Sequence, residues 1–103
     1  MSIQQDAYVD YRAMVVNWLA RNRWEASEHI IDIIVSVLMT RDNVHVLSSR
    51  FVDAVINNDL GGAVMYGDEE CQKNLTLIYK AKYNINTYHL AQIYRVKEPE
   101  EHV

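Results

Sequence analysis

Glycine and proline are scarce in this chain of 103 residues, which contains three glycines and one proline. Sandwiches and barrels of β-strands need turn residues at short, regular intervals, so this scarcity argues against them. Half of the residues are hydrophobic, which is the ordinary balance of a globular protein with one core. A chain of this length forms a single domain. The composition therefore predicts one all-α domain.

Cysteine occurs once, as Cys71, which excludes an internal disulfide and is typical of a reducing cytoplasm. Long hydrophobic runs are also missing. The most apolar stretch, residues 30–39, has about half the length of a membrane span and contains Asp32 and Ser36. The first ten residues have neither the basic region nor the apolar run of a secretory signal. We therefore expect a soluble, cytoplasmic protein without a membrane segment.

Apolar side chains recur at helical spacing along most of the chain. In the first segment these side chains are Ala7, Tyr8, Tyr11, Met14, Val15, Trp18 and Leu19. We expect a compact bundle of four to five helices over residues 1–97, followed by an acidic, frayed tail at 98–103. The expected helices span residues 3–20, 25–40, 43–57, 68–82 and 87–96, and residues 63–67 are expected to form a loop or a brief turn.

The expected second helix is apolar on nearly all sides. Its polar residues form one narrow stripe, which consists of Glu25, His29, Asp32, Ser36 and Thr40. A helix of this kind lies at the centre of a fold or is buried by a second subunit. The pattern therefore predicts a central second helix, and it favours a homodimer.

Signals for catalysis or metal binding are weak. Glu25, His29 and Asp32 could face a metal from one helix, but no second set of ligands accompanies them, and a bound metal usually needs three or four. Cys71 follows the acids 68–70, which would raise the pKa of its thiol, and no histidine is near it in the sequence. The glycines do not form a phosphate-binding motif. The sequence predicts a protein that is not an enzyme and binds no cofactor or metal.

The distribution of charge is uneven. Residues 71–97 contain five basic side chains and no acidic one, together with four tyrosines, whereas residues 1–70 contain five basic and eleven acidic side chains. The net charge of the whole chain is −4. Such a division creates a surface field that changes sign across the molecule.

Three interpretations of residues 71–97 compete. In the first, the segment is structural and its tyrosines are half-buried boundary residues. In the second, residues 76–97 form a helix-turn-helix that binds nucleic acid and presents Thr87, Tyr88, His89, Gln92 and Arg95 to a groove. The turn without glycine, Lys80 at a position that favours a small residue, and the negative net charge weaken this match. In the third, the segment binds another protein, because interfaces are rich in tyrosine, tryptophan, methionine and arginine.

The third interpretation is favoured. It predicts a small regulatory or adaptor protein that acts by binding a protein partner, itself or both, and such proteins are frequent among the accessory proteins of phages and plasmids that target host machinery. Charge reversals such as Lys82→Glu and Arg95→Glu are expected to leave stability nearly unchanged. The predicted docking residues are Tyr79, Lys80, Lys82, Tyr83, Tyr88, His89, Gln92 and Arg95.

Overall fold

A computed structural model describes residues 3–44 and 49–95 of the chain, and all regular elements of these residues are helices. The predicted all-α class is confirmed, but the described residues form seven helices where four to five were expected. The acidic tail at 98–103 lies outside the described residues. The helices are α1 (Ile3–Asn22), α2 (Glu28–Arg41), α3 (Arg50–Ile56), α4 (Leu60–Tyr66), α5 (Glu69–Lys73), α6 (Leu75–Asn84) and α7 (Tyr88–Tyr94).

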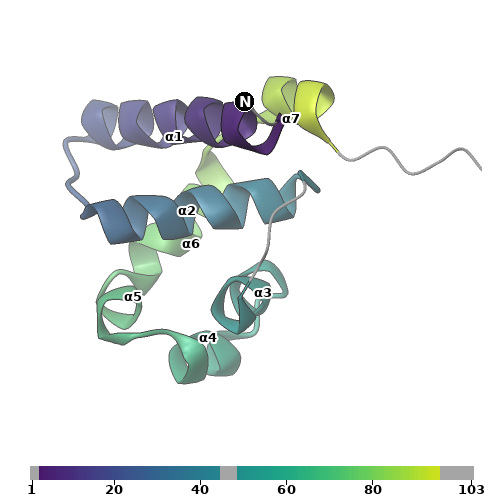
Figure 1. The fold of residues 1–103 in the computed structure, drawn as a ribbon. Coiled ribbons are helices and arrows are strands. Elements are labelled where there is room, and N and C mark those ends of the chain that lie inside the picture. The colour runs from purple at the N-terminus through teal and green to yellow at the C-terminus, as the bar shows by residue number, and fades with distance from the viewer. Residues whose placement is uncertain (1–2, 45–48, 96–103) are drawn as a thin grey trace, which may run out of the picture.

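The helices are arranged in layers around α2. Helices α1 and α7 lie side by side on one side of it, α2 runs back antiparallel to α1, and α3, α4 and α5 lie on the other side (Figure 1). Helix α2 packs against α1, α3 and α6. Its buried residues are Ile30, Ile31, Ile34, Val35, Val37, Leu38 and Met39. These side chains are covered within one chain, so the argument for a dimer that rests on this helix loses its support.

The second helix begins three residues later than expected. Ser27 is its N-cap, and the Ser27 hydroxyl accepts a hydrogen bond from the Ile30 backbone N–H at 3.2 Å. The Asn22 side-chain amide donates to the Trp18 carbonyl within α1. Arg23 then adopts a left-handed backbone with φ of 58° and ends α1.

The third helix is shorter than expected and begins at Arg50, with the Ser49 hydroxyl accepting from the Val52 N–H. Asn43, which was expected to start it, ends the preceding helix instead. Its φ is 59°, and the Val44 N–H bonds the Met39 carbonyl at 2.8 Å. Asparagine tolerates this left-handed geometry better than most residues, so a residue of this type can terminate a helix as well as begin one. Residues 45–48 of the expected helix lie outside the described residues.

The stretch at 63–67, which was expected to be a loop, lies largely in α4. Asp59 caps this helix by accepting from the Gly62 N–H at 3.0 Å, and Ala63 is fully buried where α4 packs on α3. A Cβ at Gly67 would lie 2.9 Å from the Phe51 ring. The helix is therefore held by a cap and by close tertiary packing, neither of which its short apolar pattern reveals.

The expected helix at 68–82 is divided in two. Asn74 separates α5 from α6, and its side-chain amide donates to the Glu70 carbonyl at 2.9 Å. An asparagine side chain that bonds the local backbone competes with the helical ladder, which explains the break. Asp68 caps α5 through the Cys71 N–H at 2.7 Å.

A polar network joins the end of α2 to the turn between α6 and α7. The Arg41 guanidinium donates to Oδ1 of Asp42, to the carbonyls of Lys82 and Ile85, and to the Thr87 hydroxyl. Asp42 also accepts hydrogen bonds from the hydroxyls of Thr87 and Tyr11. Buried polar groups are stable when they are paired in this way. The network fixes where α7 begins.

Among the described residues, no helix combines the length and the apolar character that crossing a membrane requires.

Candidate functional site

One of the predicted docking residues, Lys82, is buried. Lys82 is only 8% exposed, and its ammonium group donates to the carbonyls of Val55 and Ile56, at 2.9 and 3.1 Å, and to Oδ1 of Asn58, at 2.7 Å. The expectation that Lys82 belongs to an accessible docking surface is therefore wrong. Lys82 follows the buried Ile78 by four residues, so the helical spacing already carried the signal that it faces the interior. Its role is to bond the last carbonyls of α3.

An open groove of about 550 Å³ lies where the α1–α2 connection meets α5 and α6. We call it the basic groove, because three cations line it and only one acid does. The Lys80 ammonium lies 5.0 Å from the centre of the Trp24 ring, which is a cation–π contact, and Trp24 is 38% exposed. The lining residues of the basic groove are Arg23, Trp24, Glu25, Lys73, Asn74, Thr76, Leu77 and Lys80.

A second groove, of about 380 Å³, lies on the other side of Thr76 and Lys80, which line both. We call it the tyrosine groove, and its walls are mainly apolar. Tyr83 is 64% exposed, whereas Tyr79 is half-buried and its buried hydroxyl has no hydrogen-bond partner among the described residues. Tyr79 therefore offers its ring to this groove and not its hydroxyl. The lining residues are Leu60, Leu75, Thr76, Tyr79, Lys80, Tyr83 and Asn84.

The remaining predicted residues lie at the α6–α7 turn and on α7. Tyr83, Tyr88 and Arg95 line a third hollow of about 310 Å³, next to the network of Arg41 and Asp42. His89 and Gln92 are exposed on α7. Helix α7 packs mainly on α1, whereas α6 packs mainly on α2. A helix-turn-helix needs its two helices to pack together, so this arrangement weighs against that hypothesis.

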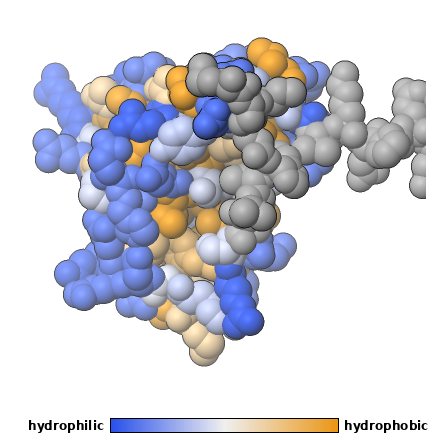
Figure 2. Space-filling view, viewed as in Figure 1, coloured by the Kyte–Doolittle hydropathy of each residue, from blue (hydrophilic) through white to orange (hydrophobic). Residues whose placement is uncertain are grey.

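Exposed apolar side chains gather on α4. Leu60, Val64, Met65 and Tyr66 are exposed by 60, 49, 75 and 48%. On the face in Figure 2, hydrophobic surface continues from the centre to the lower end, where α4 lies. Leu60 also lines the tyrosine groove, so this apolar surface and the groove are continuous. Sequence reasoning missed this surface because it treated the segment as a loop.

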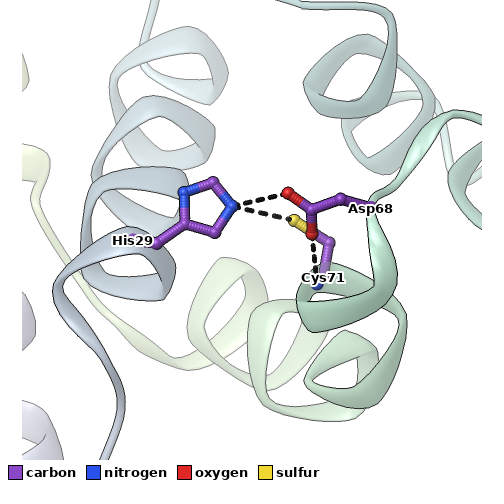
Figure 3. A group of neighbouring side chains, drawn as sticks. All are labelled: His29, Asp68 and Cys71. Carbon is purple, nitrogen blue, oxygen red and sulfur yellow. Dashed lines mark hydrogen bonds and ion pairs between the residues drawn. The ribbon is translucent and has the colours of Figure 1, made fainter.

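Sequence reasoning also missed a cluster of His29, Asp68 and Cys71 (Figure 3). Nε2 of His29 lies 2.7 Å from Oδ2 of Asp68 and 4.0 Å from Sγ of Cys71. His29 stands in the first turn of α2, whereas the other two residues stand at the start of α5. The sequence hypothesis had grouped His29 with Glu25 and Asp32, and the described residues do not bring those three together as a metal-ligand set.

The cluster is not arranged for nucleophilic catalysis. One nitrogen of His29 faces both partners, whereas a base that activates a thiol must use its two nitrogens for two different groups. Cys71 is 2% exposed, and burial, followed by the Asp68 carboxylate, raises the pKa of its thiol to about 12. The pKa of the Asp68 carboxyl is lowered, chiefly by the hydrogen bond from the Cys71 backbone N–H. The Cys71 side chain and then His29 lower it further. Cys71 is therefore a protonated thiol at neutral pH.

No family model, curated protein or solved structure matches this chain.

Proposed function

We propose that this chain is a non-catalytic protein-binding domain, a small regulatory or adaptor protein, and that it binds an acidic segment of a partner protein along α6. The observation that carries the proposal is the pair of adjacent grooves on either side of Thr76 and Lys80. The chemistry of the two grooves differs, and together they match a segment that is acidic at one end and apolar at the other.

The basic groove supports the acidic part of this partner. Arg23, Lys73 and Lys80 line it, against the single acid Glu25. Lys73 also forms an exposed ion pair with Glu69 at 3.1 Å. Exposed pairs of this kind contribute little stability, so exchanging Glu69 for a carboxylate of the partner costs little. Complementary charge at an interface mainly increases the association rate and the specificity.

The tyrosine groove supports the apolar part. Aromatic side chains provide a large contact area with few rotatable bonds, and tryptophan, tyrosine and arginine dominate the energetics of many interfaces. Trp24 of the basic groove and Tyr83 of the tyrosine groove are both exposed and both stand beside a lysine ammonium. Leu60 extends the apolar surface toward α4. The partner's apolar side chains would lie here.

The test compares two charge reversals of the same kind. Lys80→Glu removes a cation that lies over Trp24 in the groove. Arg50→Glu removes a cation of α3 that lies 5.5 Å from the centre of the Tyr66 ring on α4. A partner is first isolated from the native host with the wild-type chain and then purified. Lys80→Glu and Trp24→Ala should weaken its binding in calorimetry by at least about tenfold, as expected for the central residues of an interface. Arg50→Glu should not. Equal weakening by Lys80→Glu and Arg50→Glu would contradict the proposal.

Nucleic-acid binding through residues 76–97 stays the alternative, and salt distinguishes the two. Binding to several phosphates weakens by orders of magnitude between roughly 50 and 200 mM salt, because counterions are released on association. Binding to a protein through Trp24 and Tyr83 should weaken far less, since the centre of such an interface is apolar. Recovery of nucleic acid with the wild-type chain, together with a steep dependence on salt, would favour the alternative. The phage or plasmid origin stays a prediction as well.

A further inference from the structure

Three side chains of types that can ligate a metal converge at one point of the fold. His29, Asp68 and Cys71 offer a nitrogen, an oxygen and a sulfur atom that all lie within 4.8 Å of one another (Figure 3). The histidine comes from α2 and the other two residues from a segment about 40 residues further along the chain. A set of this kind is independent of the grooves along α6 and of the function proposed for them.

Hydrogen bonds and packing within the protein orient these atoms. Oδ1 of Asp68 accepts the hydrogen bond from the Cys71 N–H at 2.7 Å, so the cap of α5 turns Oδ2 toward His29. The Cys71 thiol is fixed by its burial in the core. Metal ligands are commonly held in place by hydrogen bonds of this kind from neighbouring groups. The site is therefore largely formed in advance.

We propose that His29, Asp68 and Cys71 bind one Zn²⁺ ion through Nε2, Oδ2 and Sγ. Zn²⁺ accepts imidazole, carboxylate and thiolate ligands in a tetrahedral arrangement, which places neighbouring ligand atoms about 3.3 to 3.6 Å apart. The observed distances from Nε2, 2.7 Å to the oxygen and 4.0 Å to the sulfur, lie on either side of this range. Rotations of the exposed His29 and Asp68 side chains, each of less than about 1 Å at the ligand atom, bring them into it.

The fourth ligand is a water molecule. The His29 and Asp68 side chains are 47 and 56% exposed, so the outer side of the site faces solvent while Cys71 closes the inner side. Binding breaks the hydrogen bond between His29 and Asp68 and releases the thiol proton of Cys71 to solvent, because only the thiolate is a zinc ligand. The thiolate and the carboxylate together balance the charge of the ion. The bound ion would join α2 to α5, a five-residue helix that packs mainly against α6.

Zinc titration of the full chain, first freed of metal with a chelator, tests the site. Competition with a coloured chelator should show one equivalent of Zn²⁺, and Co²⁺ in the same site should give the near-ultraviolet charge-transfer band of a cobalt–sulfur bond. His29→Gln and Asp68→Asn change exposed side chains, and asparagine can still cap α5 with its oxygen. Each should weaken zinc affinity at least about tenfold, since even changes outside the ligand set cost that much. His89→Gln is the matched control, because His89 is also exposed, and it should bind like the wild type.

Melting provides a second measurement. A ligand that binds only the folded state raises its stability, so excess Zn²⁺ should raise the melting temperature of the wild type and of His89→Gln but not that of His29→Gln. The proposal is overturned if the wild type takes up no zinc, if His29→Gln binds it with wild-type affinity, or if the cobalt spectrum lacks the sulfur band.

Discussion

The ammonium group of Lys82 on α6 lies 2.7 Å from Oδ1 of Asn58, which follows the end of α3. The same group bonds the carbonyls of Val55 and Ile56. Asn58 has a left-handed backbone with φ of 57°, so the lysine meets the chain where α3 turns toward α4. One buried cation thereby closes the end of a helix of seven residues, which is too short to be stable by itself.

Lys82→Met should destabilise the fold. Methionine keeps the apolar stem but removes the ammonium donor from the carbonyls of Val55 and Ile56, and losing such hydrogen bonds costs about 1 to 3 kcal/mol. For a domain of this size each kcal/mol lowers the melting temperature by roughly 4 to 8 °C. Lys73→Met is the control, because the Lys73 side chain is 72% exposed, and it should melt like the wild type. Equal melting temperatures for the two variants would show that Lys82 does not stabilise α3.

Thr87→Val should also lower stability, by about 1 to 3 kcal/mol, because hydrogen bonds to charged partners are stronger than neutral ones. Thr87 is 1% exposed, accepts from Arg41 at 2.6 Å and donates to Asp42. Valine has the same shape but can neither accept a hydrogen bond from the Arg41 guanidinium nor donate one to the Asp42 carboxylate. Thr76→Val, at an exposed position of α6, is the control. Urea unfolding measures the stability of both variants. A midpoint for Thr87→Val equal to that of the wild type would show that the polar network does not stabilise the fold.

Cys71 should be almost inert to alkylation in the folded, metal-free chain. With its pKa raised to about 12 by burial and by Asp68, the thiolate fraction at pH 8 is about a thousandfold lower than that of a thiol in the unfolded chain. Mass spectrometry after treatment with iodoacetamide, with and without urea, measures the two rates. Similar rates would mean that the thiol is accessible and ionised in the fold.

The same shift predicts a loss of stability at alkaline pH. The pKa of the thiol is higher in the folded chain than its ordinary value of 9.0. The stability that the protonated thiol contributes is therefore fully present below about pH 9. It falls as the pH rises toward about 12, because the unfolded chain ionises first. Cys71→Ala should remove this part of the dependence when unfolding free energies of the two chains are compared across that range. If the unfolding free energies of the wild type and Cys71→Ala change with pH in parallel, the raised pKa of the thiol is contradicted.

Self-association stays a prediction, and the structure moves the surface for it from α2 to α4. Met65 and Val64 are exposed apolar residues, whereas the apolar side chains of α2 are buried. We expect a dimer at micromolar concentration that Met65→Glu dissociates. Val9→Glu changes an equally apolar, 59% exposed position on α1 and should leave the dimer intact. Sedimentation equilibrium measures the mass, and a wild-type mass near 12.0 kDa would rule out self-association at that concentration.

Helix ends were harder to predict than helices. Asn43 and Asn74 are both followed by apolar segments, yet one ends α2 and the other divides two helices. Asparagine is compatible with helix starts, helix ends and left-handed turns, so its presence marks a boundary without saying of which kind. Aspartate is equally compatible with a turn or a helix start, and in the structure a carboxylate oxygen of Asp59 caps α4. The cap and the packing of α4 on α3 together select that helix over a loop.

The sequence by itself determined the helical class, because apolar periodicity and the scarcity of turn residues are local properties that need no knowledge of the fold. It also located the change of charge at residue 71. Only the tertiary structure decided which groups the side chains of that segment contact. Lys82 turned out to be a buried cap and Lys80 a wall of two grooves, although they are two residues apart. It also brought His29 to Cys71 across 42 residues, because contacts between distant segments depend on how whole helices pack and not on the pattern within either one.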